Sequence, residues 1–276
     1  MSGTLYLVPT PIGNLGDISR RIADTLEQAD FIAAEDTRVT LKLLNHLGIK
    51  KPMVSYYRHN TAAGGEAVLR RLLSGESCAL VTDAGTPAIS DPGEELVAEC
   101  VARSIPVVSI PGPCALITAL AASGLPTDRF TFEGFLPMNK KNRRERLSEL
   151  RGEGRTMLFY EAPHKLCATL ADLSETFGSD RRIAVCRELT KLHEEILRTT
   201  LDQAVAHYAQ NPPKGEFVLV VEGCQAEKTE SVTLEDGVRR VLALREEGLS
   251  LKDATRQAAA ETGLPKNELY QLVLKG

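Results

Sequence analysis

Short apolar runs alternate with helical patterns through the first 125 residues of the chain. Each run leads into a loop rich in Gly, Pro or Asp, and a segment with apolar residues at helical spacing follows. Strands are predicted at 5–8, 31–34, 78–81 and 107–110, and the helices after them end near Leu26, Gly48, Arg103 and Gly124. This alternation predicts an α/β domain with a mostly parallel sheet. Its ligand site is expected beyond the carboxyl ends of the strands, where these loops fall.

The pattern changes near Leu125-Pro126, after which strands are more frequent and clean βα repeats are fewer. Strands are predicted at 129–132, 156–160, 183–187, 195–199 and 216–221, with helices at 139–150, 165–177 and 201–210. After a polar linker, 225–231, three short helices at 234–247, 251–262 and 266–274 have a helix–turn–helix cadence. We therefore predict two α/β domains, 1–125 and 126–225, and a C-terminal helical domain, 229–276.

Composition narrows the class of protein. The 276 residues are 43% hydrophobic and 25% charged, which suits a folded globular protein and argues against global disorder. The six cysteines are too widely spaced for a zinc site, so we predict no metal site and reduced thiols in the cytoplasm. Prolines interrupt the longest charge-free stretch, 104–127, so a strand, a turn and a buried helix are expected there and not a membrane span.

The loop from Thr82 to Gly93 carries the sharpest chemical signal. It is much longer than the usual two to six residues of a βα loop, and it combines acidic and hydroxyl side chains with Gly and Pro. Gly85 allows a ligand to approach the backbone closely. Asp91, before Pro92-Gly93, also fits a cap for the next helix. The loop after the first strand, 9–17, is either a rigid turn with a helix cap or a backbone cradle; neither a GxGxxG nor a GxxxxGK[ST] fingerprint is present.

The loop Thr82-Asp-Ala-Gly-Thr-Pro-Ala-Ile-Ser-Asp-Pro-Gly93 resembles a motif of the bacterial 16S rRNA (cytidine-2′-O)-methyltransferases, which belong to the tetrapyrrole-methylase (class III) fold group. Further matching segments, in chain order, are 8–17, 34–38, 59–60, 110–115, 134–137, 159–164, 187–191 and 215–223. The resemblance covers nearly the whole chain. It implies two α/β domains with a cleft for S-adenosylmethionine between them, and a homodimer. Where tetrapyrrole-modifying relatives have Gly-Asp-Pro, this chain has Gly85-Thr86-Pro87, which argues against a tetrapyrrole substrate.

The same resemblance implies which residues lie at the cofactor: Pro9, Gly85, Thr86, Ile89, Cys114, Ala115, Tyr160, Leu189 and Gly215. Methyl transfer depends mainly on aligning the ribose oxygen with the methyl group, and a base or a nearby cation helps the hydroxyl to lose its proton. Candidates for these catalytic roles are Asn14, His59, Asp83, Glu161, His164, Arg187 and Lys191. For each of them a structural hydrogen bond or ion pair is the competing interpretation.

Charge locates the expected RNA contact. The net charge is only −4, so binding of a polyanion needs a local basic patch. The segment 138–155 has seven basic and three acidic residues, and Lys140, Lys141, Arg143, Arg144 and Arg146 are its candidate RNA-binding residues. We expect ribosomal RNA, within the small subunit, as the partner.

Two other classes of function stay open. One is a nucleic-acid-binding regulator whose α/β part senses a small molecule, although the slightly acidic tail, 229–276, counts against it. The other is a methylase of small molecules on the same fold, which would not need the basic segment.

Overall fold

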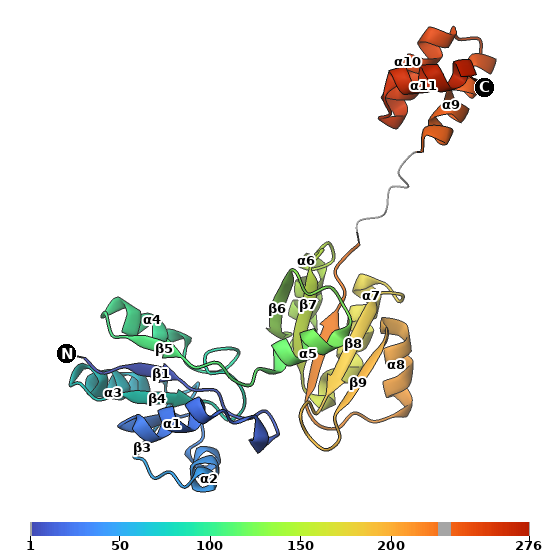
Figure 1. The fold of residues 1–276 in the computed structure, drawn as a ribbon. Helices are drawn as coiled ribbons and strands as arrows, with labels where there is room; N and C mark the ends of the chain where they lie inside the picture. The colour runs from blue at the N-terminus through green and yellow to red at the C-terminus, as the bar shows by residue number, and fades with distance from the viewer. Residues whose placement is uncertain (1, 226–232, 276) are drawn as a thin grey trace. The chain divides into compact units, whose positions relative to one another are not determined.

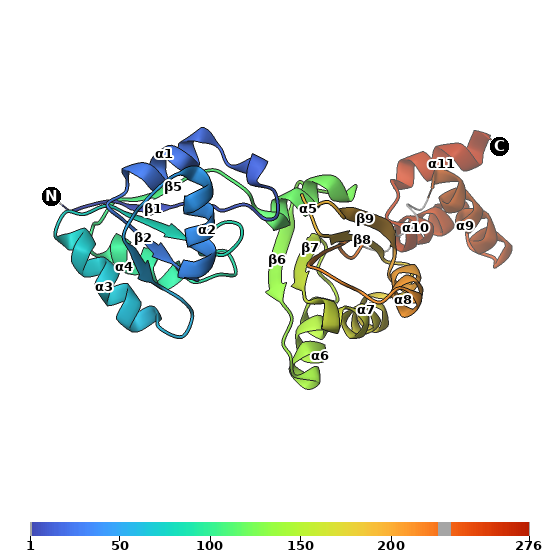
Figure 2. The same cartoon turned by 90° about the horizontal axis from the view of Figure 1, so that it is seen from below.

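The computed structural model describes residues 2–225 and 233–275, and the chain divides into two compact units, Met1–Cys224 and Gln225–Gly276. Figures 1 and 2 show the ribbon from two sides. The linker predicted at 225–231 lies, apart from Gln225, outside the described residues. No helix in the two described stretches combines the length and the apolar character needed to cross a membrane.

The first five strands form a fully parallel sheet, where a mostly parallel sheet containing four of them was predicted. They are β1 (Leu5–Leu7), β2 (Phe31–Ala34), β3 (Met53–Ser55), β4 (Cys78–Val81) and β5 (Val107–Ser109), in the order β3-β2-β4-β1-β5. Their carboxyl ends meet at one edge, so the loops after β1, β2, β4 and β5 lie close together.

Helices cover both faces of this sheet because successive strand residues point to opposite sides. Phe31 and Leu80 face α3 (Thr61–Leu73) and α4 (Glu94–Ala102) in one core, whereas Ile32 and Val81 face α1 (Arg20–Gln28) and α2 (Thr37–Leu47) in the other. A short 3₁₀ helix, η1 (Leu15–Asp17), precedes α1. Neither β3 nor α3 was predicted from the sequence.

The second sheet is mixed. Its strands are β6 (Phe130–Phe135), β7 (Thr156–Glu161), β8 (Arg182–Arg187), β9 (Glu195–Thr200) and β10 (Phe217–Val221), in the order β6-β7-β10-β8-β9. Only the β6–β7 pair of this sheet is parallel. Helices α6 (Lys140–Glu149), α7 (Pro163–Phe177) and α8 (Leu201–Gln210) cover one face (Figure 2).

The opposite face of the second sheet carries α5 (Ala115–Ser123), which packs Leu116 and Leu120 on Leu158 and Val220. Figures 1 and 2 both show α5 beside this sheet. The chain was expected to change domains at 125–126, but α5 already belongs to the second core. Ile12, from the loop after β1, packs into the same core, so the two sheets share apolar contacts around this face.

The C-terminal unit consists of α9 (Leu234–Glu246), α10 (Leu251–Thr262) and α11 (Lys266–Lys275), close to the predicted ranges. Thr233 and Asp236 form a reciprocal capping box at the start of α9. Gly263, at φ 70°, ends α10 in the left-handed conformation. Val241, Leu244, Ala254, Ala258 and Leu269 form the small core of this unit.

Candidate active site

A hydrogen-bond network fixes the loops at the carboxyl ends of the first sheet. Thr10 and Gly85 exchange both backbone hydrogen bonds, at 2.9 and 3.0 Å. The Thr10 hydroxyl donates to the Thr82 carbonyl at 3.0 Å, and the Thr82 hydroxyl donates to Glu35 Oε2 at 2.6 Å. Thr86 donates to the Pro113 carbonyl at 3.0 Å. Loops that follow four different strands are therefore held as one rigid wall.

The second half of the long loop has an unusual backbone. Ala88 and Ser90 have left-handed φ values of 66° and 70°, which cost roughly 1–2 kcal/mol each in residues with a Cβ. Gly93 has φ 146°, and a Cβ there would lie 3.0 Å from side-chain atoms of Ala88 and Leu80. Gly93 is itself the N-cap of α4, without a side-chain cap hydrogen bond, so Asp91 does not cap that helix. Strain of this kind, held by surrounding structure, is typical of functional loops.

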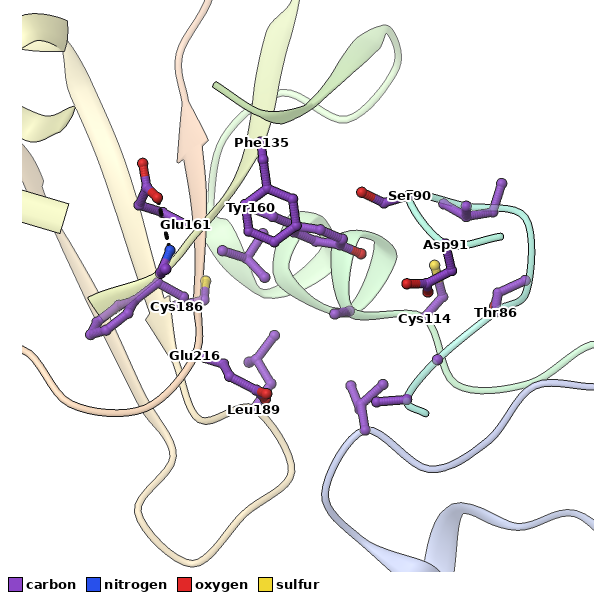
Figure 3. A pocket seen from close by; sticks show the side chains of 18 of the residues that line it. Thr86, Ser90, Asp91, Cys114, Phe135, Tyr160, Glu161, Cys186, Leu189 and Glu216 are labelled. Carbon is purple, nitrogen blue, oxygen red and sulfur yellow. Dashed lines mark hydrogen bonds between the residues drawn. The ribbon is translucent and has the colours of Figure 1, made fainter. Parts of the chain in front are cut away.

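The strained loop and the second sheet enclose a cavity of about 390 Å³ (Figure 3). Seven of the nine predicted cofactor residues line it: Gly85, Thr86, Ile89, Cys114, Ala115, Tyr160 and Leu189. Pro9 and Gly215 do not line it. Pro9 packs behind the wall, since a Cβ on Gly112 would lie 2.8 Å from it, and Gly215 makes room for the Glu188 side chain.

An aromatic cluster forms the wall on the second sheet. Tyr160 makes edge-to-face contacts with Phe132 and Phe135, with ring centroids 4.9 and 5.6 Å apart. Gly134, at φ 63°, shifts the register of β6 so that Phe135 pairs with Tyr160. Burial raises the pKa of Tyr160 to about 12, so the phenol is neutral at physiological pH.

Carboxylates at the cavity differ in their surroundings. Burial, together with the nearby Glu35 carboxylate, raises the pKa of Asp91 to about 6. Figure 3 shows Asp91 and Glu216 reaching toward the cavity from opposite walls. Glu161 turns away instead: it accepts hydrogen bonds from the Ala162 amide at 2.8 Å and from the Thr169 hydroxyl at 2.5 Å. Glu161 is therefore held as a buried anchor for the start of α7.

The other predicted catalytic residues do not line the cavity. Asn14 caps η1 by accepting from the Gly16 amide at 2.9 Å, so the loop after β1 is the turn with a cap. His59 and His164 are exposed, and Asp83 accepts from the Asp36 amide at 3.1 Å. Arg187 pairs with Glu195 at 3.0 Å. Lys191 pairs with Glu216 at 2.9 Å, which places its ammonium group next to a cavity-lining carboxylate.

The predicted RNA-binding residues lie on α6 and differ in their availability. Lys140 and Lys141 are exposed, and Lys141 lies 3.8 Å from Glu145. Arg143 makes a buried ion pair instead, with its Nη2 2.6 Å from Asp172 of α7. The two remaining arginines are half-exposed and paired, Arg144 with Glu175 and, at 3.8 Å, with Asp172, and Arg146 with Glu133 and Glu149.

Replacing Arg143 with alanine is therefore expected to destabilise the fold by about 3 kcal/mol, because the buried Asp172 carboxylate would keep only its longer contact, of 3.8 Å, with the half-exposed Arg144. Chemical denaturation measures this loss. Arg144→Ala removes the neighbouring guanidinium, which is 50% exposed, and should cost no more than about 0.5 kcal/mol. Equal stabilities for the two variants would show that the Arg143–Asp172 pair does not hold α6 on α7.

Several residues of the site were not predicted from the sequence. Glu35 supports the loop through Thr82, and Ser90, Phe135 and Glu216 line the cavity. Three of them, Glu35, Phe135 and Glu216, lie in segments that resemble the family. The fold is needed to show which of their side chains face the cavity.

Comparison with known proteins agrees with this geometry. A model of the tetrapyrrole (corrin/porphyrin) methylases matches residues 4–205, and a model of the RsmI C-terminal HTH domain matches residues 232–276. A crystal structure of uroporphyrin-III C-methyltransferase from Thermus thermophilus, complexed with S-adenyl homocysteine, shares the fold, with a TM-score of 0.56 over 79% of this chain and 97% of that one, at 15% identity. The chain belongs to the tetrapyrrole methylase family and is a methyltransferase, which confirms the predicted fold class.

Full-length relatives give the narrower group. The ribosomal RNA small subunit methyltransferase I of Synechocystis sp. is 50% identical over 99% of this chain and 98% of its own length. The enzyme of the same name from Halalkalibacterium halodurans is 49% identical over 98% of this chain and 94% of its own. Within the methylase family, the chain thus belongs to the ribosomal RNA small subunit methyltransferase I group, and the resemblance found in the sequence is confirmed.

Proposed function

We propose that this protein transfers the methyl group of S-adenosylmethionine to the ribose 2′-oxygen of a cytidine in small-subunit (16S) ribosomal RNA. The observation that carries the proposal is the match to small-subunit rRNA methyltransferases along almost the entire chain, C-terminal helices included. The neutral Thr86 at the position where tetrapyrrole-modifying relatives have an acid supports an RNA substrate over a tetrapyrrole.

The cavity fits the cofactor in size and in charge. Its volume of about 390 Å³ lies within the 300–1,000 Å³ typical of small-molecule sites. S-adenosylmethionine supplies an electrophilic methyl group on a positively charged sulfur. Tyr160, Leu189 and Ile89 offer apolar surface to its uncharged parts, and the Asp91 carboxylate complements its positive charge. The Gly85–Thr86 turn lines the opposite wall.

The protein contributes chiefly by positioning and by excluding water. Hydrogen bonds within the protein hold the wall around Thr10, Thr82 and Thr86, and a rigid wall reduces the ordering that binding requires. Methyl transfer is faster when the acceptor hydroxyl is already held in line with the methyl group, because the two groups do not have to find this alignment by diffusion.

We propose a homodimer that works in the cytoplasm on ribosomal RNA within the small subunit. Family resemblance supports the dimer, and the rRNA substrate supports the location. Light scattering should give twice the chain mass of 30.0 kDa; the mass of a single chain would contradict the dimer.

Exposed lysines of α6 are proposed to contact RNA phosphates. A Lys140→Ala/Lys141→Ala variant should weaken binding of small-subunit rRNA and lower the slope of log K against log salt by about 1 to 2. Filter binding at several salt concentrations measures this slope. Lys50→Ala/Lys51→Ala, in the connection between α2 and β3, removes the same charge and serves as the control. Equal slopes for the two variants would remove α6 from the RNA interface.

The proposed reaction is tested with labelled S-adenosylmethionine and small ribosomal subunits from cells that lack the gene. Nucleoside mass spectrometry should recover the label in 2′-O-methylated or doubly methylated cytidine. Label in another nucleoside would correct the target. Cofactor binding without RNA labelling would favour a methylase of small molecules.

A further inference from the structure

A second cavity, of about 450 Å³, adjoins the first. It lies on the other side of the strained loop, and its lining includes Tyr56, Arg58 and Glu94. Ser90, Asp91 and Phe135 line both cavities. A reaction between a small cofactor in one cavity and a nucleotide in the other would take place at these shared residues.

Asp91 lies at the junction of the two cavities. It does not cap α4, and the left-handed Ser90 before it and Pro92 after it fix its backbone. Figure 3 shows its carboxylate directed into the first cavity, near Cys114 and Thr86 and across from Tyr160. Its orientation therefore comes from a strained backbone and places an ionisable oxygen at the junction.

The second cavity has features that suit a nucleotide. Arg58, whose guanidinium donates to the Ser90 carbonyl at 3.3 Å, offers a cation for phosphate in a lining that also contains Asp91, Glu94 and Glu95. The Phe135 ring is 55% exposed at the junction, where a base can stack on it.

We propose that Asp91 is the general base of the methyl transfer and that the acceptor nucleotide enters through the second cavity. This inference rests on the proposed function and names the acceptor side of its site.

In the proposed step the acceptor 2′-hydroxyl loses its proton to the Asp91 carboxylate. A lone pair of the oxygen forms the new C–O bond to the methyl carbon. The C–S bond breaks, and its electron pair stays on sulfur, which leaves as a neutral thioether. The proton on Asp91 passes to water after the product departs, so the net products are the methyl ether, the thioether and one proton.

The charged surroundings of Asp91 suit this role. Burial and the carboxylates of Glu35 and Asp83 raise its pKa to about 6, against the opposing effects of the nearby Thr82 side chain and the charge of Arg58. A base of this strength is ionised at neutral pH and still accepts a proton. The rate should therefore be constant above about pH 7 and fall as the pH drops through 6.

Asp91→Asn tests the assignment with a change of one atom. Single-turnover methylation of small subunits should fall by about 10²- to 10⁴-fold, and the remaining rate should no longer decrease at low pH. Affinities for S-adenosylhomocysteine and for rRNA should stay within about threefold. Asp91→Glu, which keeps the carboxylate, should recover part of the rate. Glu99→Gln, an exposed carboxylate-to-amide change on α4, is the matched control.

Carboxyl-labelled aspartate in the free wild-type enzyme gives a readout independent of activity. NMR should show one carboxyl that titrates near pH 6 and is missing in Asp91→Asn. Wild-type-like turnover in Asp91→Asn, or a wild-type rate that is flat from pH 5 to 8, would overturn the inference and leave the proposed function intact. Failure of the wild-type enzyme to label RNA would instead overturn the proposed function.

Discussion

Ala115→Trp is expected to abolish cofactor binding, lowering the affinity for S-adenosylhomocysteine by about 100-fold or more. Ala115 is the first residue of α5 and lines the first cavity, so an indole there takes space that the ligand needs. The fold should tolerate the change, because Ala115 lies at the edge of the core and is only partly buried. Isothermal titration calorimetry measures the affinity.

The control for this variant is Ala121→Trp, an exposed position on the same helix. S-adenosylhomocysteine at 100 times its dissociation constant should stabilise the wild type and the control by about 2.7 kcal/mol, and Ala115→Trp hardly at all. If Ala115→Trp gained the same stability, the cofactor would have to bind somewhere other than this cavity.

The parallel sheet was predictable because each strand is apolar and each following loop carries strong turn residues. β3 and α3 were missed for a physical reason. The strand has only three residues, and Gly64 and Gly65 weaken the helical pattern of α3. The structure explains Gly64: a Cβ there would lie 2.9 Å from the Ser55 carbonyl oxygen, so the close contact between α3 and β3 requires glycine.

The residues that line the cofactor cavity were predicted more successfully from the sequence than the catalytic residues. Thr86 follows β4 of the first sheet, whereas Tyr160 lies near the end of β7 in the second sheet. The resemblance to a family with a cofactor cleft between two α/β domains predicted that they line one cavity. Which carboxylate is free depends on hydrogen bonds that the sequence does not display. Glu161 is occupied by Thr169 and the Ala162 amide, whereas Asp91, which fitted a helix cap by its spacing, leaves the capping position to Gly93.

The charged residues of α6 are a second case in which the sequence does not show which side chains are free to bind a ligand. The sequence gives the same prediction, an RNA contact, for each basic residue of α6. In the structure Arg143 is buried against Asp172, whereas Lys140 is exposed. The partner is 29 residues away, on another helix. A contact of that kind depends on how α6 crosses α7, and helical periodicity alone does not determine it.

Gly237→Val is expected to unfold the C-terminal helices while leaving residues 2–224 folded and able to bind cofactor. A Cβ at this position would lie 2.6 Å from side-chain carbons of both Leu264 and Leu269, so α9 would be pushed away from α11. Overpacking of this kind costs typically 1–3 kcal/mol. A unit whose buried core has five residues has little stability to lose. Amide hydrogen exchange should show loss of protection across α9–α11.

Glu235→Val is the matched control for Gly237→Val, because it places the same β-branched side chain at an exposed position of the same helix. It should cost only the few tenths of a kcal/mol that helix propensity predicts. All residues that line the cofactor cavity belong to the first unit, so S-adenosylhomocysteine should bind both variants like the wild type. Loss of cofactor affinity in Gly237→Val alone would mean that the first unit depends on the helical one for its folded state.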